Sequence, residues 1–215
     1  LSYYGRLNYT LMDRYMLTAT IRRDGSSRFA EGKKWGTFPS VALAYNIAKE
    51  NFFEPLAKTI NDLKVRVSYG VTGQQDGIAN YGYMSYYYPS TIGAHYMFGN
   101  QAYTSYRPTV YNKDLTWETT KAFNVGLDFG FLNNRYTASI DFYTRKTEDL
   151  LATVTIPAGY NFNKEMLRNV GNVTSKGVEF SFNANIISTE NWQWMIVGNA
   201  TYQHNRITNL NGNNM

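Results

Sequence analysis

The sequence has no cysteine and only two histidines, His95 and His204, which lie far apart in the chain. The lack of cysteine excludes a disulfide framework and thiolate metal sites. Two distant histidines support neither a zinc site nor a histidine-based catalytic triad. We therefore expect a protein that is not an enzyme, with no catalytic residue and with neither a metal ion nor another cofactor.

Long apolar runs are also absent, because no stretch approaches the ~20 consecutive apolar residues that a membrane-spanning helix needs. Hydropathy alone would therefore indicate a soluble protein, but it does not detect membrane barrels, whose strands are apolar only at every second residue. Charged residues make up 17% of the chain and aromatic residues 16%, with 19 tyrosines and 12 phenylalanines. This aromatic excess is typical of strands and of the aromatic girdles of outer-membrane barrels.

The 215 residues carry a net charge of +5, which raises the question of a nucleic-acid partner. A nucleic-acid site gathers its cations in one patch or stripe. Here the cations are scattered over predicted strand ends and loops, where a solvated rim is the better interpretation, so we expect no nucleic-acid partner. The cations concerned are Arg22, Arg23, Arg28, Lys33, Lys34, Arg145, Lys146 and Arg206.

The pattern that is present is an alternation of apolar and polar residues with a period of two. From Leu63 to Thr72 every odd position is apolar, and the even positions carry Lys, Arg, Ser, Gly and Thr. The alternation returns at 123–131, 136–143 and 178–186. The apolar face of such a strand points to the core in a soluble sandwich or small barrel and to lipid in a membrane barrel, so the period alone leaves both open.

The polar faces carry charges of both signs next to glycines, namely Arg66, Asp128, Asp141 and Glu179. A soluble core seldom contains this much charge, so we interpret these four residues as lumen-facing. The carboxylates could also be drawn as a paired-carboxylate hydrolase, but ion pairs across a polar lumen are the better interpretation. The cations expected to pair with the carboxylates are Arg66, Arg135, Arg145 and Lys176.

About eight strands joined as successive hairpins are predicted. They lie near residues 2–12, 15–24, 36–47, 63–73, 116–131, 135–148, 173–187 and 192–205. Tight turns, such as Asp13-Arg14 and Asn133-Asn134, alternate with long connections. Because bacterial membrane barrels have short periplasmic turns and long extracellular loops, this alternation orients the chain. Residues 48–62 fall on the short-turn side and are predicted to form a short helical or irregular periplasmic segment.

The longest connection, from Gly73 to Leu115, is rich in tyrosine. Flat rings with a polar hydroxyl suit stacking on sugars or docking of peptides, which makes these tyrosines candidates for contact with a substrate or a protein lid. The alternative, which is the more common situation, is that the rings pack the loop against itself and the barrel rim. The candidates are Tyr83, Tyr86, Tyr87, Tyr88, Tyr103 and Tyr106.

Several short motifs occur in a fixed order along the chain. They are RRDGSSRF at 22–29, WGTFPS at 35–40, ENFF at 50–53, LKVRVSYGVTGQQ at 63–75, LTWE at 115–118, NVGLD at 124–128, NVGN at 169–172 and KGVE at 176–179. This series resembles the barrel of SusC/RagA-type TonB-dependent transporters of Bacteroidetes. Many motifs in the right order, over nearly the whole chain, are far more specific than any single one.

The resemblance implies an all-β fold in which residues 1–215 form about eight strands of a larger antiparallel transmembrane β-barrel. Barrels of this kind have about 22 strands and, in this family, an N-terminal plug. The signal peptide, plug and closing strand are expected to lie outside the sequence. The implied function is active import of oligosaccharides or peptides across the outer membrane. The implied partners are outer-membrane lipid, a SusD-like surface lipoprotein and, through the missing N-terminal region, the TonB complex.

Two other functions stay open on the residues alone. One is a small outer-membrane barrel of about eight strands with a role in adhesion or anchoring, a known size for membrane barrels. The other is a soluble β-rich protein that binds carbohydrate on an aromatic platform. The absence of a closing strand at the polar end, 211–215, counts against the first, and the charged would-be core counts against the second.

Overall fold

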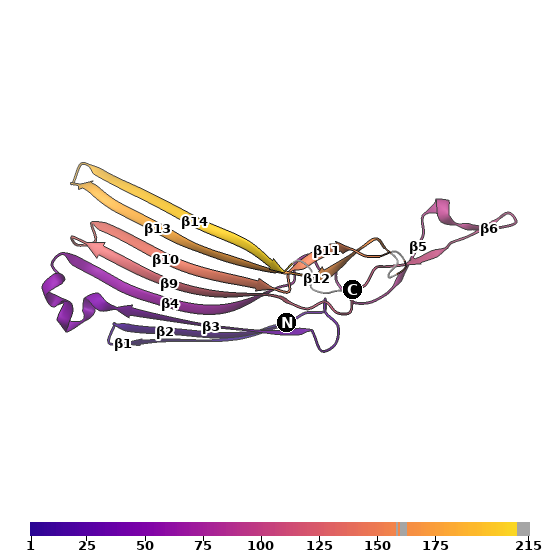
Figure 1. Cartoon of the computed structure of the whole chain (residues 1–215), viewed down its shortest axis with the longest axis horizontal. Coiled ribbons are helices and arrows are strands. Elements are labelled where there is room, and N and C mark those ends of the chain that lie inside the picture. Colours follow the sequence, from indigo (N-terminus) through magenta and orange to yellow (C-terminus); the bar gives the residue numbers. More distant parts are fainter. Residues whose placement is uncertain (158, 160–162, 210–215) are drawn as a thin grey trace.

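The computed structural model describes residues 1–157, 159 and 163–209. Eight long strands form one antiparallel sheet in the order β1-β2-β3-β4-β9-β10-β13-β14, and the other elements gather at its two ends (Figure 1). The strands are β1 (Ser2–Leu11), β2 (Tyr15–Gly25), β3 (Trp35–Asn46), β4 (Ile60–Gln74), β9 (Glu118–Phe131), β10 (Tyr136–Glu148), β13 (Asn172–Ser188) and β14 (Gln193–Asn209). The predicted all-β fold of successive hairpins is confirmed.

The remaining elements are short. The strand pairs are β5 (Tyr87–Pro89) with β8 (Tyr106–Pro108), β6 (Tyr96–Phe98) with β7 (Gln101–Tyr103), and β11 (Leu151–Thr155) with β12 (Glu165–Asn169). The 3-10 helices are η1 (Ile47–Lys49), η2 (Asn51–Leu56) and η3 (Ile92–Ala94). Within the described residues no helix is long and apolar enough to span a membrane. Runs of three to five residues are too short to show a period of two, so these strands could not be predicted from the sequence.

The turns at one end of the sheet are tight and rely on left-handed backbone conformations. Asp13 has a φ of 54°, and Asn133 and Asn134 both have a φ of 59°. Asparagine and aspartate tolerate this conformation better than most residues, which explains why the chain reverses direction there. The predicted turns are confirmed, and the long connections all leave the opposite end of the sheet (Figure 1).

The segment between β3 and β4 is the exception that the sequence indicated. It forms η1 and η2 at the short-turn end and is attached to the neighbouring hairpin by Glu50. The Glu50 carboxylate accepts a hydrogen bond from Arg14 at 2.9 Å and another from the Tyr15 hydroxyl at 3.0 Å. Phe53 is only 6% exposed. The ENFF motif therefore holds this segment against the end of the sheet.

The sheet has one apolar and one polar face along its whole width. The strand register connects directly opposed residues into rows that run across all eight strands. One complete row consists of Tyr9, Leu17, Leu43, Val67, Val125, Phe142, Val178 and Tyr202. We call the face that carries this row the apolar face. It also carries the residues expected to face lipid, which are Val65, Val67, Tyr69, Val125, Leu127, Ile140, Phe180 and Phe182.

The apolar face is a band that crosses the strands obliquely. Counted in steps of two residues from the row of Val67 toward the long connections, the first charge on this face is Arg23 at three steps on β2. On β9 and β10 it is Lys121 and Lys146 at two steps, on β13 it is Lys176 at one step, and on the edge strand β14 it is Arg206 at two steps. From β2 to β13 the boundary moves toward the row of Val67, as a flat boundary does where it cuts tilted strands, and barrel strands tilt by about 35–45°.

The band has the thickness of a membrane. On β9 the apolar-face residues from Phe123 to Phe131 are all apolar, which is about 27 Å at ~3.4 Å per residue. With the strand tilt this corresponds to about 20 Å of depth, close to the ~25 Å apolar band of outer-membrane barrels. Leu43 and Phe142 in the band are each 55% exposed, so no described element covers them. A contiguous apolar surface of this size disfavours the soluble alternative.

The buried core lies at the long-connection end and not beneath the sheet. Phe29, Ile78 and Leu115 are at most 3% exposed, and Trp117, Leu151 and Leu167 pack against them. These residues come from all three long connections and the strands beside them. The loops therefore share one small core that fixes them to the end of the sheet.

The sheet does not close on itself, because β1 and β14 each have only one neighbour. An open edge in lipid exposes backbone groups that cost several kcal/mol each when they are unsatisfied. The structure is thus part of a barrel, which counts against a self-contained barrel of eight strands.

Substitution of Val67 by Arg should destabilise the full-length protein by ~2–4 kcal/mol, because it puts a charge at mid-depth on a lipid-facing surface. Ser68→Arg, on the polar face one residue away, should cost far less. Denaturant titration of the barrel in lipid measures both. Spin labels at 67 and 127 test whether the apolar face points to lipid. If water-soluble quenchers reach these labels more readily than lipid-soluble ones, the assignment of the two faces is inverted.

Expression of residues 1–215 alone should not give a closed, monomeric barrel, because the edges of β1 and β14 would stay unpaired. Heat-modifiable migration on gels and protease resistance in detergent measure closure. A resistant, heat-modifiable monomer would show that the isolated segment closes, and would restore the small-barrel alternative.

Candidate functional site: the polar face and the loop arm

The polar face carries a three-residue ion cluster centred on Arg66. Its guanidinium binds Asp128 in a bidentate manner, with Nε to Oδ2 at 2.9 Å and Nη2 to Oδ1 at 2.8 Å. The same Nη2 donates to Asp141 Oδ2 at 3.0 Å. The cluster links β4, β9 and β10, and the three side chains are 37%, 25% and 18% exposed, respectively. Bidentate pairing fixes the guanidinium plane as well as its charge.

Gly126 makes this cluster possible. It lies on β9 directly between Arg66 on β4 and Asp141 on β10. A Cβ atom at this position would lie 2.7 Å from the guanidinium carbon of Arg66 and even closer to Asp141. The missing side chain lets the arginine reach across a whole strand, so the glycine of the NVGLD motif has a packing role.

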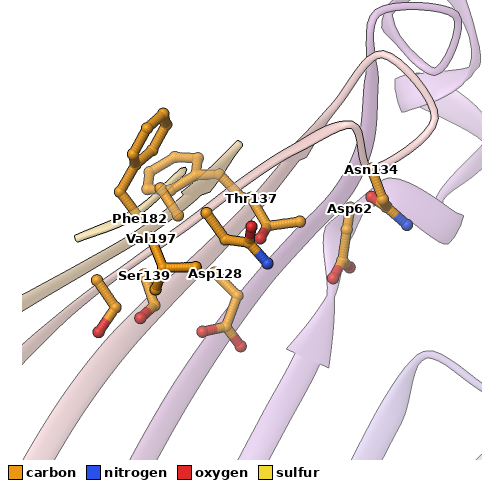
Figure 2. A pocket seen from close by; sticks show the side chains of 11 residues that line it. Asp62, Asp128, Asn134, Thr137, Ser139, Phe182 and Val197 are labelled. Carbon is orange, nitrogen blue, oxygen red and sulfur yellow. The ribbon is translucent and has the colours of Figure 1, made fainter. Parts of the chain in front are cut away.

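A depression of about 380 Å³ adjoins the cluster at the short-turn end, lined by polar side chains of the polar face and also by the apolar Phe129, Ala138, Phe182 and Val197. Figure 2 shows the carboxylates of Asp62 and Asp128 on one side of the strands and the ring of Phe182 on the other. Thr137, Ser139, Ser181 and Asn183 line it too, and the buried Asn183 side-chain oxygen has no hydrogen-bond partner within the described residues. Such a surface can bind hydroxyl or amide groups through hydrogen bonds.

The other charges predicted to form ion pairs across this face do not join the Arg66 cluster. Glu179 lies on the polar face opposite Asp141, but it is exposed and the structure shows no ion pair for it among the described residues. Arg135 donates instead to the backbone carbonyl of Asn185 at 2.7 Å, and the Arg145 guanidinium lies 4.7 Å from the ring centre of Tyr143.

The expectation that Lys176 pairs with carboxylates of the polar face is wrong. The register pairs Lys176 with Thr144 and His204, two residues from the row of Val178, so it lies on the apolar face. Its charge suggested a polar lumen, but its position at the boundary of the apolar band explains the charge equally well.

The tyrosine-rich connection forms an arm that projects beyond the end of the sheet (Figure 1). Its two hairpins are β5 with β8 and β6 with β7. Tyr87 is 66% exposed, Tyr106 64%, Tyr86 54% and Tyr103 50%. Tyr88 is half-buried, and the guanidinium of Arg107 lies 4.4 Å from its ring centre.

The six candidate tyrosines thus divide into two groups. Four expose large rings on the arm, whereas Tyr83 and Tyr88 are half-buried. Sequence reasoning did not separate them, because the exposure of a ring in a short hairpin depends on pairing that three-residue strands do not reveal. Met97 and Phe98, at 58% and 66% exposure, extend the same surface and were missed.

Polar motif residues fasten the arm and the other loops to the sheet. Arg28 donates to the carbonyl of Gln75 at 3.0 Å, which joins the first two long connections. The buried Glu118 accepts from the Leu151 amide at 2.9 Å, and Asn169 exchanges two hydrogen bonds with the backbone of Thr116. The motifs at 22–29, 115–118 and 169–172 therefore build the loop base, and they do not reach the depression on the polar face.

Comparison with known proteins supports the resemblance. The family model described as TonB dependent receptor-like, beta-barrel matches residues 1–215. The chain is 48% identical over 211 residues to the TonB-dependent receptor SusC of Bacteroides thetaiotaomicron, which covers 98% of the chain and 21% of that protein. It is 37% identical over 213 residues to the TonB-dependent receptor P26 of Formosa agariphila, with 98% and 21% covered. The chain therefore spans about a fifth of the length of these relatives.

Solved structures show the same fold. The RagAB peptide importer in its closed-closed state matches with a TM-score of 0.84 and 31% identity, over 97% of the chain and 22% of that chain. The alcaligin outer membrane receptor FauA of Bordetella pertussis matches with a TM-score of 0.55 over 98% of the chain and 31% of that chain. At 15% identity, the FauA match shows a shared fold alone.

Gly126→Ala should destabilise the full-length protein by about 1–2 kcal/mol, because the added methyl group displaces a charged hydrogen-bond cluster. Gly198→Ala is the matched control, since a Cβ there meets no atom within 4 Å. Denaturant midpoints at unchanged slope measure both variants. Equal midpoints for the two would show that the Arg66 cluster does not depend on Gly126.

Proposed function

The chain belongs to the TonB-dependent receptor-like β-barrel family, and we propose that it forms about eight strands of the barrel wall of an outer-membrane importer. The observation that carries this proposal is the oblique apolar band, whose thickness and tilt suit a strand wall embedded in lipid. The relatives named above are receptors and an importer, so the family is one of receptors and not of enzymes.

The polar face is proposed to line the passage. In a barrel the face opposite to lipid points inward, and Arg66, Asp128, Asp141 and Glu179 all lie on that face. Their mixed charges suit an aqueous interior that polar cargo crosses. The depression beside Asp128 adds carboxylate, hydroxyl and amide groups that can exchange hydrogen bonds with hydrated cargo.

The partners are proposed by analogy with the relatives. One similar structure is that of the RagAB peptide importer, and the SusC and P26 relatives are named as TonB-dependent receptors. By analogy we assign this protein an oligosaccharide or peptide cargo, a SusD-like surface lipoprotein as lid, and the TonB complex as energy source. Residues 1–215 would belong to the barrel, and the plug and closing strand to the rest of the protein.

The arm of the longest connection is the proposed contact surface for cargo or lid. It lies on the side that the turn lengths mark as extracellular. Its exposed rings include Tyr86, Tyr87, Tyr103 and Tyr106. Rings with a polar hydroxyl tolerate several binding poses, which suits a surface that captures varied ligands. Tyr83 and Tyr88 are assigned a supporting role, because both are half-buried.

The double variant Tyr86→Ala/Tyr87→Ala in the full-length protein should reduce cargo uptake or lipoprotein binding severalfold and leave barrel assembly intact, because the arm lies outside the sheet. Tyr86→Phe/Tyr87→Phe keeps the rings and is the matched control. Tyr88→Ala tests the packing role separately. Uptake of labelled cargo, co-purification of the lipoprotein and heat-modifiable migration are the measurements.

Full uptake and full lipoprotein binding in the assembled double-alanine variant would refute the contact role of the arm. A loss of assembly in that variant, with Tyr→Phe unaffected, would assign the rings to folding. The transport proposal itself depends on a separate measurement, which is uptake by the unmodified protein with and without TonB.

A further inference from the structure

A group of cations lies on the apolar face at its boundary with the long connections. Lys121 on β9 and Lys146 on β10 are directly opposed. Lys146 is also opposed to Thr174 on β13, which in turn is opposed to Arg206 on β14. Lys176 is two residues from Thr174 on the same face. Four strands therefore bring four cations to one edge of the apolar band, although they were scattered in the sequence.

Thr174 is at the centre of three of these cations. Lys146 and Arg206 flank it in the register, and directly opposed residues have Cβ atoms about 4.5–5.5 Å apart. Lys176 lies about 7 Å away along the strand, at ~3.4 Å per residue. Long cationic side chains that surround a small hydroxyl residue can converge on a single oxyanion, with arginine offering paired donors.

The cluster has an excess of positive charge. Four positive side chains and one carboxylate, Glu148, which binds two of them, leave a net charge of +3. Glu148 binds both Lys121, at 2.5 Å, and Lys146, at 2.7 Å. Glu148 therefore neutralises part of the charge at the Lys121 and Lys146 end of the group, and within the described residues the structure shows no ion pair for Lys176 or Arg206.

The depth of the cluster matches that of lipid head groups. Phe123 ends the apolar band on β9 and Lys121 is the next residue on that face, about 7 Å further along the strand. Val178 and Lys176 form the same boundary on β13. Cations immediately beyond an apolar band attract anionic head groups. A merely solvated rim would not need four like charges at one edge, because like charges on neighbouring strands repel each other.

We propose that Lys146, Thr174, Lys176 and Arg206 form a binding site for the phosphate group of an anionic lipid in the outer leaflet. The ion pair between Lys121 on β9 and Glu148 on β10 lies at the edge of this site nearest β9. The proposal rests on the apolar face being embedded in lipid, and it adds a specific contact that neither transport nor embedding requires. The site lies outside the barrel passage, since its residues share the face of Val178.

Lipid binding to the full-length protein, measured by native mass spectrometry in detergent with added phosphatidylglycerol or phosphatidylcholine, tests this proposal. Lys176→Gln/Arg206→Gln should weaken phosphatidylglycerol binding by roughly 30-fold, at about fivefold per cation removed. These two side chains carry no ion pair in the described structure, so the fold should be unaffected. Lys113→Gln/Lys164→Gln removes the same charge from the loops and should bind like the parent.

Two further variants sharpen the test. Glu148→Gln removes the competing carboxylate and should tighten phosphatidylglycerol binding about fivefold. Thr174→Val keeps the shape and removes the hydroxyl, and should weaken binding by a smaller factor than the double variant. Neither change alters a residue of the Arg66 cluster or the arm.

Equal loss of phosphatidylglycerol binding in the loop control and in the double variant would overturn the proposal. So would equal affinity of the parent for the anionic and the zwitterionic lipid. Inorganic phosphate is the third ligand to be tested. If phosphate binds the protein without lipid and displaces phosphatidylglycerol at the same concentrations, the site is one for free phosphate and the lipid proposal is overturned. If the protein inserts into lipid but does not prefer phosphatidylglycerol to phosphatidylcholine, this site alone is refuted and the transport proposal is unaffected.

Discussion

Backbone hydrogen bonding in lipid is the constraint on which this structure depends. No water is present at that depth, so each strand needs a neighbour on both sides. The consecutive antiparallel pairing from β1 to β14 meets this need at all positions except the two outer edges. Long strands in register then fix two faces, because every second side chain points the same way. This pairing gathers the apolar side chains of the long strands on one face. In the proposed barrel that face meets lipid and does not form a core.

The polar face shows how such a wall tolerates charge. Arg66 is satisfied by two carboxylates from the next two strands, and Gly126 leaves the space that the side chain crosses. A partly exposed ion cluster of this kind costs less than a buried one, because water still reaches it. It joins three strands on the face that has no apolar packing. Charge and glycine thus act together as structural elements of the wall.

The two ends of the sheet are built differently. At the short-turn end, single hydrogen-bonded contacts such as Arg14 with Glu50 are sufficient. At the other end, three long connections need a core of their own, which Phe29, Ile78 and Leu115 supply. Four of the eight motifs, at 22–29, 50–53, 115–118 and 169–172, belong to these two ends. These four support the loops and turns, whereas the proposed cargo or lid contacts would lie on the more exposed arm.

The sequence by itself determined the strands, the tight turns, the presence of two faces and the family, because period, turn residues and motif order are local features. It also placed Arg66, Asp128 and Asp141 on one face. Register is not local, so only the tertiary structure decided that Gly126 separates Arg66 from Asp141. Lys176 shares the parity of Val178, yet its charge suggested the lumen. Side-by-side pairing of four strands, which no single segment encodes, decided that it joins Lys146 and Arg206 at the edge of the apolar band.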